Sequence, residues 1–331
     1  MNPAWAGKRL WSIILAGGEE SRVGSLIRCW LGRPTPKQYC TFVGTRSLLQ
    51  RTVDRAAKLS EWEHIVAVIS RGYEPEARSQ LNGRAECMLL AQPTHAKTTA
   101  ALYVSLTSIR ARDPQATVVV YPSDHVVYPE SRFLQLVQRA VWTVEWLPDR
   151  LVLLGIAPDH LQLDYGWIRP GEKLDTSNNY RISALRSFLE HPTVAQDDAA
   201  LAEGALWNTN VFAAKATALW EVGWRCCPAL MERCEHLAKQ IGTSKEAGTL
   251  DALYQDMPAY DFSSDILQLV PDRMVVVEMT GVLWSDWNTP ERIAHMLHRI
   301  GRQPAFPLTC LTPPFAPLPV ALAEDSVLPA G

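Results

Sequence analysis

The stretch WSIILAGGEESR, residues 11–22, decides the fold, because a short apolar run ends there abruptly in two glycines, Gly17 and Gly18. Such a run is typical of a strand in a buried parallel sheet, and ligands bind beyond the carboxyl ends of these strands. Glycines at that place let backbone amides approach an anion, and Arg22 and Lys37 can neutralise phosphate charge. The stretch predicts a phosphate-binding turn; the alternative is an ordinary strand-to-helix turn. Its spacing excludes a Walker loop and the GxGxxG pattern of dinucleotide-binding folds.

Apolar runs and amphipathic stretches alternate through the first half of the chain. The predicted strands are Leu10–Leu15, His64–Ser70, Cys87–Leu90, Thr117–Tyr121 and Leu151–Ile156. The predicted helices between them are Ser47–Leu59, Glu74–Leu81, Thr98–Ala111 and Ser131–Val144. This alternation predicts an α/β fold with a doubly wound, Rossmann-like, mostly parallel (mixed) sheet.

The second half of the chain is less regular. Tyr180–Leu189 alternates like a solvent-facing strand, Pro228–Ile241 has a helical pattern, and Met274–Val277 is a further strand. We expect these segments to form a lobe inserted on the same sheet. From about Gln303 the chain is rich in proline, which indicates a tail, residues 301–331, that runs over the surface or is disordered.

Composition bounds the kind of protein. The chain has 331 residues, 47% hydrophobic and 20% charged, with a net charge of -3. This near-neutral balance gives no basic footprint for nucleic acid and no polybasic membrane patch. No apolar run approaches the roughly 20 residues of a membrane span, and the apolar N-terminal stretch is read as the first strand and not as a signal peptide. We therefore expect a soluble, cytoplasmic protein.

Seven cysteines occur, and none forms a CxxC pair. An odd number without a disulfide framework suits a reducing compartment, so we expect buried or idle thiols. The alternative is a soft-metal site at Cys226, Cys227 and Cys234, but no second pair of ligands completes a zinc set.

Short motifs follow one another in a recognisable order. They are LAGG at 15–18, PKQ at 36–38, PSDH at 122–125, YGxI at 165–168, E-x-P at 190–192, WN at 207–208 and WSD at 284–286. This order resembles the sugar-phosphate nucleotidyltransferases, and among them it is most similar to the mannose-1-phosphate guanylyltransferase (GDP-mannose pyrophosphorylase) family. The resemblance covers roughly residues 9 to 300. The ending Asp286–Glu291 also echoes a DxxTPE pattern of other nucleotidyltransferases, which leaves sugar and base open.

The resemblance implies a nucleotide-diphospho-sugar transferase fold, with a nucleotide half at about 1–160 and a sugar-binding half at about 161–300. It implies transfer of a nucleotidyl group from a nucleoside triphosphate to a sugar 1-phosphate, which gives an NDP-sugar and pyrophosphate. GTP and mannose 1-phosphate are the leading candidates for the two substrates. Arg22 would stabilise the pyrophosphate, and Lys37 the sugar phosphate or the α-phosphate. No nucleic acid or membrane is implied as a partner, and a homo-oligomer remains open.

The resemblance also assigns binding residues. The nucleotide would contact Ala16, Gly17, Gly18, Pro93 and Thr98. For Thr98 the alternative is a plain helix N-cap, because threonine favours that position.

Three residues of the second half would bind the sugar: Gly166, Glu190 and Asn208. The alternative for the neighbouring aromatic residues Phe188, Trp207 and Phe212 is a place in the core.

Asp124 and Asp286 form the implied metal pair, each at a predicted strand end. Mg²⁺ prefers hard oxygen ligands, usually one or two carboxylates together with phosphate oxygens and water. For either aspartate alone, the alternative is a turn or a helix cap. His125 is expected to be structural, because a neutral histidine beside a carboxylate often orients it.

Two departures from the family pattern support a different hypothesis. Glu20 stands where the family has glycine beside the triphosphate, and His191 replaces the lysine that meets the sugar phosphate. A carboxylate close to phosphates is unfavourable. The alternative to an enzyme is thus a catalytically impaired member that binds a sugar nucleotide or a protein partner.

Overall fold

The computed structural model describes residues 9–18, 22–82, 87–93, 97–159, 164–175, 180–190, 192–255 and 257–311. The strands are β1 Leu10–Ala16, β2 Ile65–Ser70, β3 Met88–Gln92, β4 Thr117–Pro122, β5 Val126–Tyr128, β6 Leu151–Ile156, β7 Trp167–Asp175, β8 Ile182–Leu189, β9 Leu206–Lys215, β10 Met274–Glu278 and β11 Leu283–Ser285. The α-helices are α1 Gly24–Leu31, α2 Leu48–Ala56, α3 Glu74–Gln80, α4 Thr98–Arg112, α5 Glu130–Trp146, α6 Val194–Ala202, α7 Ala216–Cys226, α8 Pro228–Ala238, α9 Glu246–Tyr254, α10 Phe262–Asp265 and α11 Pro290–Arg299. The 3₁₀ turns are η1 Lys37–Tyr39, η2 Trp62–His64, η4 Leu267–Leu269, η5 Pro271–Arg273 and η6 Leu308–Cys310.

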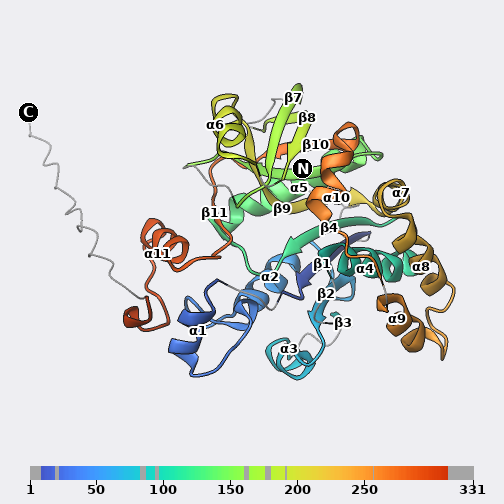
Figure 1. The fold of residues 1–331 in the computed structure, drawn as a ribbon, viewed down its shortest axis with the longest axis horizontal. Helices are drawn as coiled ribbons and strands as arrows, with labels where there is room; N and C mark the ends of the chain where they lie inside the picture. Colours follow the sequence, from blue (N-terminus) through green and yellow to red (C-terminus); the bar gives the residue numbers. More distant parts are fainter. Residues whose placement is uncertain are drawn as a thin grey trace, which may run out of the picture.

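One nine-stranded sheet organises the molecule, in the order β3-β2-β1-β4-β9-β6-β10-β8-β7 (Figure 1). β1 pairs in parallel with both β2 and β4, and β6 pairs in parallel with β10. β9 runs antiparallel between β4 and β6. The predicted α/β fold with a mostly parallel, mixed sheet is confirmed.

Helices cover both faces of the sheet around β1, β2, β4 and β6, which explains why these four strands are buried along almost their whole length. Ile14 of β1 packs in the cluster under α2 and α5, whereas its neighbour Ile13 packs in the cluster under α4, α7 and α8. Both isoleucines are fully buried. Among the helices that the structure describes, none is both long and apolar enough to cross a lipid bilayer.

The second half of the chain extends the same sheet. The strand predicted at Tyr180–Leu189 is β8, which pairs antiparallel with β10 on one side and β7 on the other. The predicted alternation is not regular, because Ile182 and Phe188 are buried while Arg186, which an alternating strand would place on the same face, is exposed. The pairing of β8 with β7 also shifts register, for example between Arg169 and Pro170. β7 also pairs with β9, so the strands β9, β6, β10, β8 and β7 close into a ring.

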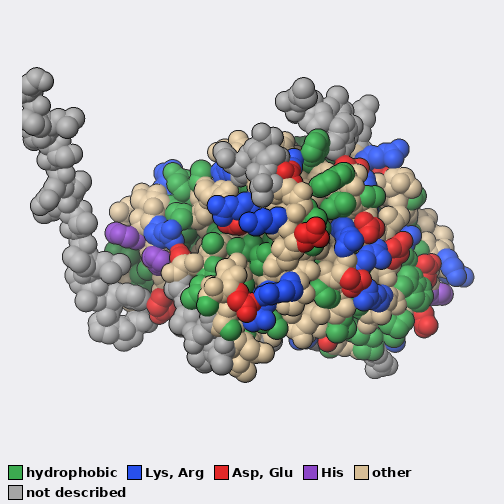
Figure 2. All heavy atoms as spheres, turned by 90° about the horizontal axis from the view of Figure 1, so that it is seen from above, with side chains coloured by type: hydrophobic (Ala, Val, Ile, Leu, Met, Phe, Trp, Pro, Cys, Tyr) green, Lys and Arg blue, Asp and Glu red, His purple; other side chains and the backbone are tan. Residues whose placement is uncertain are grey.

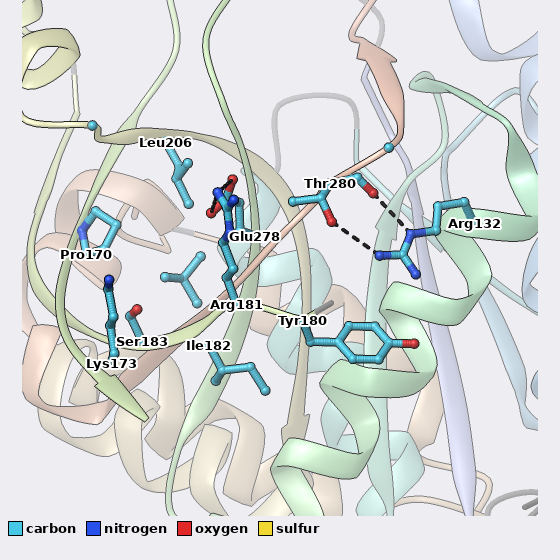
Figure 3. Close-up of a pocket in the computed structure, with 13 residues that line it drawn as sticks. Arg132, Pro170, Lys173, Tyr180, Arg181, Ile182, Ser183, Leu206, Glu278 and Thr280 are labelled. Atoms are coloured by element: carbon cyan, nitrogen blue, oxygen red, sulfur yellow. Dashed lines mark hydrogen bonds and ion pairs between the residues drawn. The ribbon is translucent and has the colours of Figure 1, made fainter. Parts of the chain in front are cut away.

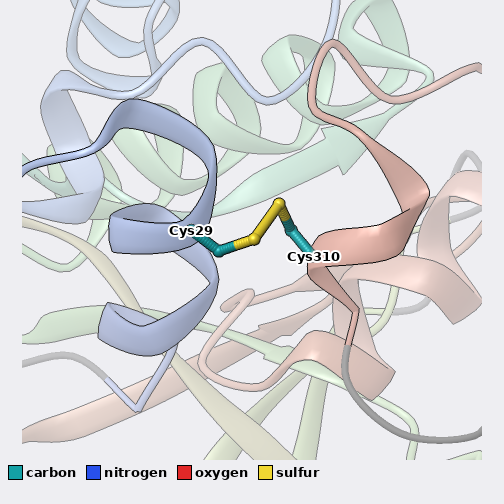
Figure 4. The surroundings of a disulfide bond; sticks show 2 residues. All are labelled: Cys29 and Cys310. Atoms are coloured by element: carbon teal, nitrogen blue, oxygen red, sulfur yellow. A yellow bond between two sulfur atoms is a disulfide. The ribbon is translucent and has the colours of Figure 1, made fainter.

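The proline-rich segment begins folded. Phe306 is buried in a small core with α1 and α11, and η6 lies against α1. Cys310 forms a disulfide with Cys29 of α1, with the two Cα atoms 5.6 Å apart (Figure 4). The expectation that every cysteine is an idle thiol was therefore wrong for this pair. The two residues are 281 positions apart, and such a pairing cannot be deduced from spacing. Residues 312–331 lie outside the described part of the chain.

The alternative metal site at the clustered cysteines finds no support. Burial raises the pKa of Cys227 and of Cys234 to about 12, so neither is a thiolate at neutral pH. Within the described residues, no three His, Cys, Asp or Glu side chains are grouped as they would be to hold a metal ion.

Gly223 allows α7 to approach α4 and α8 closely. A Cβ at this position would lie 2.6 Å from Tyr103 Cε1 and 2.5 Å from Met231 Sδ. We expect Gly223→Ala to lower the free energy of unfolding by about 1–3 kcal/mol through overpacking, measured by urea denaturation. Gly248→Ala in α9, where no atom lies within 4 Å of the new Cβ, is the matched control. Gly248→Ala should stabilise the protein by up to about 1 kcal/mol. If Gly223→Ala stabilised the protein as much as Gly248→Ala does, the close packing at Gly223 would be contradicted.

Candidate active site

The glycine turn after β1 is held from beneath by side chains of neighbouring segments. Gln38 of η1 donates Nε2 hydrogen bonds of 2.8 Å to the carbonyl oxygens of Ala16 and Gly18. Ser70, the last residue of β2, donates a 2.6 Å bond to the carbonyl of Gly17. A Cβ on Gly17 would lie 2.4 Å from Gln92 Nε2, so glycine is needed for this close approach. These bonds hold the backbone of residues 16–18 in place, while Glu20 lies outside the described residues.

Lys37 is a buried cation at the centre of the site. Its side chain is 4% exposed, and its Nζ lies 3.0 Å from Asp124 Oδ2. The same ammonium donates to the Asp286 carbonyl oxygen at 2.7 Å and to Asn288 Oδ1 at 2.6 Å. An ammonium has three protons to donate, and these three partners match that number. Lys37 therefore joins η1 to the end of β4 and to the segment between β11 and α11.

Asp124 is a partly accessible carboxylate, with 33% of its side chain exposed. Burial is the largest single influence on the pKa of Asp124 and raises it. The charge and hydrogen bond of Lys37, together with His125 and a backbone hydrogen bond, lower it by more in total, so this pKa lies below its ordinary value. His125 Nε2 lies 3.7 Å from Asp124 Oδ1. His125 Nδ1 accepts a 3.3 Å hydrogen bond from Trp284 Nε1, so in the neutral ring the proton is on Nε2, facing the carboxylate. This geometry agrees with an orienting role for His125.

Asp286 is buried, 5% exposed, and surrounded by donors. Arg292 Nη1 lies 3.0 Å from Oδ1 and 2.8 Å from Oδ2. Tyr165 donates its hydroxyl to Oδ1 at 3.0 Å, and Asn288 donates Nδ2 to Oδ2 at 2.8 Å. Burial, followed by the negative charge of Asp286, raises the pKa of Tyr165, which keeps this hydroxyl protonated as the donor.

Arg22 is held by a carboxylate that the sequence motifs did not point to. Its guanidinium donates to both oxygens of Asp164, at 2.6 and 3.3 Å. Arg292 donates a 3.0 Å bond to the same carboxylate. The hydrogen bond from Arg22 is the largest cause of the lowered pKa of Asp164. The one local signal in the sequence is that Asp164 directly precedes the YGxI motif at 165–168.

Charges balance within this cluster of described residues. Three cations face three carboxylates: Arg22, Lys37 and Arg292 against Asp124, Asp164 and Asp286. Each cation is within salt-bridge distance of at least one carboxylate.

The residues predicted to bind sugar lie together beside this cluster. The backbone N–H of Asn208 donates a 2.8 Å bond to the Gly166 carbonyl. A Cβ on Gly166 would lie 2.3 Å from Glu190 Oε2, so only glycine leaves room for that carboxylate. Gly166 directly follows Tyr165, which contacts Asp286. His191, the other departure from the family pattern, lies outside the described residues.

The aromatic residues near these three are core residues. Phe188, Trp207 and Phe212 are each at most 4% exposed, which confirms the alternative for their rings.

Pro93 and Thr98 lie beyond the carboxyl end of β3, on the same edge of the sheet. Gln92, next to Pro93, places its amide against Gly17. The N-cap alternative for Thr98 was wrong by one residue. Lys97 occupies the N-cap without a side-chain bond, and Thr98 is the exposed first residue of α4.

A hollow lies apart from these residues. A cavity of about 790 Å³ is bounded by β7, β8, β10 and α5, and none of the predicted site residues lines it (Figure 3). Its two arginines are bonded within its wall, since Arg132 donates to Thr280 and Arg181 pairs with Glu278 at 3.0 Å. Basic and acidic side chains are mixed over the face seen in Figure 2.

The buried ring of His125 generates a pH prediction. Burial lowers its pKa below the ordinary 6.5, so the unfolded chain takes up this proton at a higher pH than the folded chain. The stabilisation is present above about pH 6.5 and is lost as the pH falls towards the folded pKa. We expect His125→Gln to lose less stability than the wild type between about pH 7.5 and about pH 5.5, measured from urea midpoints. His295→Gln, on the exposed face of α11, is the control; equal losses in all three proteins would contradict the assignment.

Comparison with known proteins identifies the family of the chain. The sequence model of the family described as Nucleotidyl transferase matches residues 11–289. The mannose-1-phosphate guanylyltransferase of Escherichia coli K12 is 26% identical over 288 residues, which cover 85% of this chain and 58% of that protein. The xanthan biosynthesis protein XanB of Xanthomonas campestris (strain B100) is 27% identical over 278 residues, covering 83% of this chain and 56% of that protein. The chain thus spans little more than half the length of these relatives.

Solved structures share the fold. A Thermus thermophilus protein described as mannose-1-phosphate geranyltransferase superposes with a TM-score of 0.73 at 22% identity, covering 89% of this chain and 80% of that one. A putative glucose-1-phosphate thymidylyltransferase of Bacillus anthracis gives 0.57 at 13% identity, covering 91% of this chain and 98% of that one. The match over residues 11–289 shows that the chain belongs to the nucleotidyl transferase family, as a divergent relative of the mannose-1-phosphate guanylyltransferases.

Proposed function

We propose that this chain transfers a nucleotidyl group from a nucleoside triphosphate to a sugar 1-phosphate. The observation that carries the proposal is the cluster at the carboxyl edge of the sheet, where the glycine turn, the Lys37–Asp124 pair and the exposed Arg22 meet. GTP and mannose 1-phosphate are the substrates we propose first, because the relatives in Escherichia coli are named for that reaction.

In this reaction an oxygen of the sugar phosphate attacks the α-phosphorus of the triphosphate. The bond from the α-phosphorus to the oxygen that bridges it to the β-phosphorus breaks, and pyrophosphate leaves with that oxygen. The protein has little covalent chemistry to do, so its task is positioning and neutralisation of charge. Arg22, with 65% of its side chain exposed, would exchange Asp164 for the leaving pyrophosphate. The glycine turn would give the nucleotide close backbone contact.

Mg²⁺ fits one of the two predicted aspartates. Asp124 offers a partly exposed carboxylate, and one carboxylate with phosphate oxygens and water is a common magnesium arrangement. Asp286 does not fit as it lies, because Arg292, Tyr165 and Asn288 already occupy its oxygens. When bound at Asp124, the ion would supply positive charge for the phosphates. Lys37 would keep that carboxylate ionised and in place.

The sugar would lie over Gly166, Glu190 and Asn208, beside the same cluster. The absence of a side chain at Gly166 gives the Glu190 carboxylate its room, and carboxylates accept hydrogen bonds from sugar hydroxyls. The backbone bond from Asn208 to Gly166 ties β9 to the segment before β7.

The direct test of the proposal is release of pyrophosphate by the purified protein with Mg²⁺. Mannose 1-phosphate and glucose 1-phosphate are each combined with the four nucleoside triphosphates. We expect release that requires both substrates, fastest with GTP and mannose 1-phosphate. Absence of release in every combination, from protein shown to be folded by its unfolding transition, would contradict the proposal and favour the binding-only alternative.

Arg22 supplies a second test. Arg22→Gln removes the charge that would meet the pyrophosphate, and we expect the KM for the triphosphate to rise about tenfold, equivalent to about 1.4 kcal/mol. Arg225→Gln is the matched control, since Arg225 is also exposed and pairs with an aspartate, Asp272, at 2.8 Å. Similar KM values for the two variants would exclude Arg22 from the triphosphate site.

A further inference from the structure

The Asp286 carboxylate has no acceptor position left for a metal ion. Two carboxylate oxygens offer about four lone-pair sites. Oδ1 accepts from Tyr165 at 3.0 Å, from Arg292 at 3.0 Å and from the backbone N–H of Asn288 at 3.2 Å. Oδ2 accepts from Arg292 at 2.8 Å and from the Asn288 side chain at 2.8 Å. A metal ion on this carboxylate would have to displace at least one of these donors.

Arg292 is the donor least able to leave. Its side chain is 9% exposed, and its guanidinium also bonds Asp164 at 3.0 Å. The same group lies 4.6 Å from the centre of the Tyr165 ring, in cation–π contact. Its backbone N–H donates to Thr289 Oγ1 at 3.3 Å, which caps α11 and fixes the start of the helix. Displacement would leave a buried guanidinium with one carboxylate lost, and a buried charge without its partner is strongly unfavourable.

Asp124 differs in each of these respects. One third of its side chain is exposed, and it lies within ion-pair distance of Lys37 at 3.0 Å and of His125 at 3.7 Å. It follows the end of β4 at the ligand edge of the sheet, where phosphate oxygens and water can complete an octahedral set.

We propose that the Arg292 guanidinium takes the place of a divalent metal ion on Asp286, so that this site binds its metal through Asp124 alone. Arg292 and Asp164 are then positioning residues. Arg292 holds Asp286, and Asp164 links Arg292 to Arg22 until the triphosphate binds. The guanidinium of Arg292 then supplies the positive charge that a metal ion on Asp286 would otherwise supply. The inference rests on the proposed function in one respect, because the metal is taken to arrive with a triphosphate.

The test is the affinity for Mn²⁺, measured by titration calorimetry in the presence of GTP with a methylene group between its α- and β-phosphorus atoms, which does not react. We expect Asp124→Asn to weaken Mn²⁺ binding at least tenfold. The double variant Asp286→Asn/Arg292→Gln, which removes both charges and keeps hydrogen-bonding groups, should bind Mn²⁺ within about threefold of the wild type. Asp159→Asn, which breaks the exposed pair with Arg299 of α11, is the control for surface charge.

Arg292→Gln alone frees the Asp286 carboxylate and should tighten Mn²⁺ binding or add a second equivalent of metal. The inference is overturned if the double variant loses Mn²⁺ as severely as Asp124→Asn, or if the folded wild type binds no Mn²⁺ in the presence of the analogue. Unfolding transitions of all variants separate loss of metal from loss of fold. The experiment measures Mn²⁺ binding and not turnover. If the variants show the expected Mn²⁺ affinities, the inference about Asp286 is supported even when the protein releases no pyrophosphate. If the wild type releases pyrophosphate but the variants do not show these affinities, the inference about Asp286 is refuted and the proposed function is not.

Discussion

The buried ammonium of Lys37 is the interaction on which the rest of the site depends. A buried charge is stable only when it is paired and hydrogen-bonded, and loss of one partner of a buried pair costs about 3–5 kcal/mol. Lys37 meets this requirement with one carboxylate and two neutral oxygens, each from a segment far away in the chain. Gln38, the next residue, holds the glycine turn. Two adjacent side chains of one 3₁₀ turn thus set the positions of both the glycine turn and the acidic residues.

The second organising feature is the difference between the two ends of the charge network. The Arg22–Asp164 pair is exposed, and exposed pairs contribute only about 0–1 kcal/mol. In the proposed reaction, pyrophosphate would therefore replace Asp164 on Arg22 with little loss of stability. In the Arg292–Asp286 pair both side chains are buried, since 9% of the Arg292 side chain and 7% of the Asp286 side chain are exposed. An exchange of partners there leaves a buried charge without solvent or a counter-charge. The exposed Arg22–Asp164 pair is accordingly suited to exchange with a ligand, whereas the buried Arg292–Asp286 pair is suited to a structural role.

Sequence reasoning succeeded where local pattern and fold physics agree. The five strands of the first half are continuous apolar runs because both faces of a parallel sheet are covered. Prediction from sequence failed where a feature depends on tertiary contacts, or where the local residues favour a different element from the one that forms. β7 contains Pro170, Gly171 and several charged residues, which resembles a loop, and α1 begins at Gly24 without a side-chain cap. Nothing in the spacing between Asp164 and Arg22 indicates their pairing, because only the fold brings residues 142 positions apart together.

The central claim is that phosphate of the sugar substrate becomes part of the product while pyrophosphate leaves from the nucleotide. Mass spectrometry after turnover of mannose 1-phosphate with ¹⁸O in its phosphate group tests this claim directly. The account predicts ¹⁸O in the NDP-sugar and none in the released pyrophosphate. Label in pyrophosphate, or turnover of the triphosphate without a labelled NDP-sugar, would contradict attack at the α-phosphorus and with it the function proposed for this site.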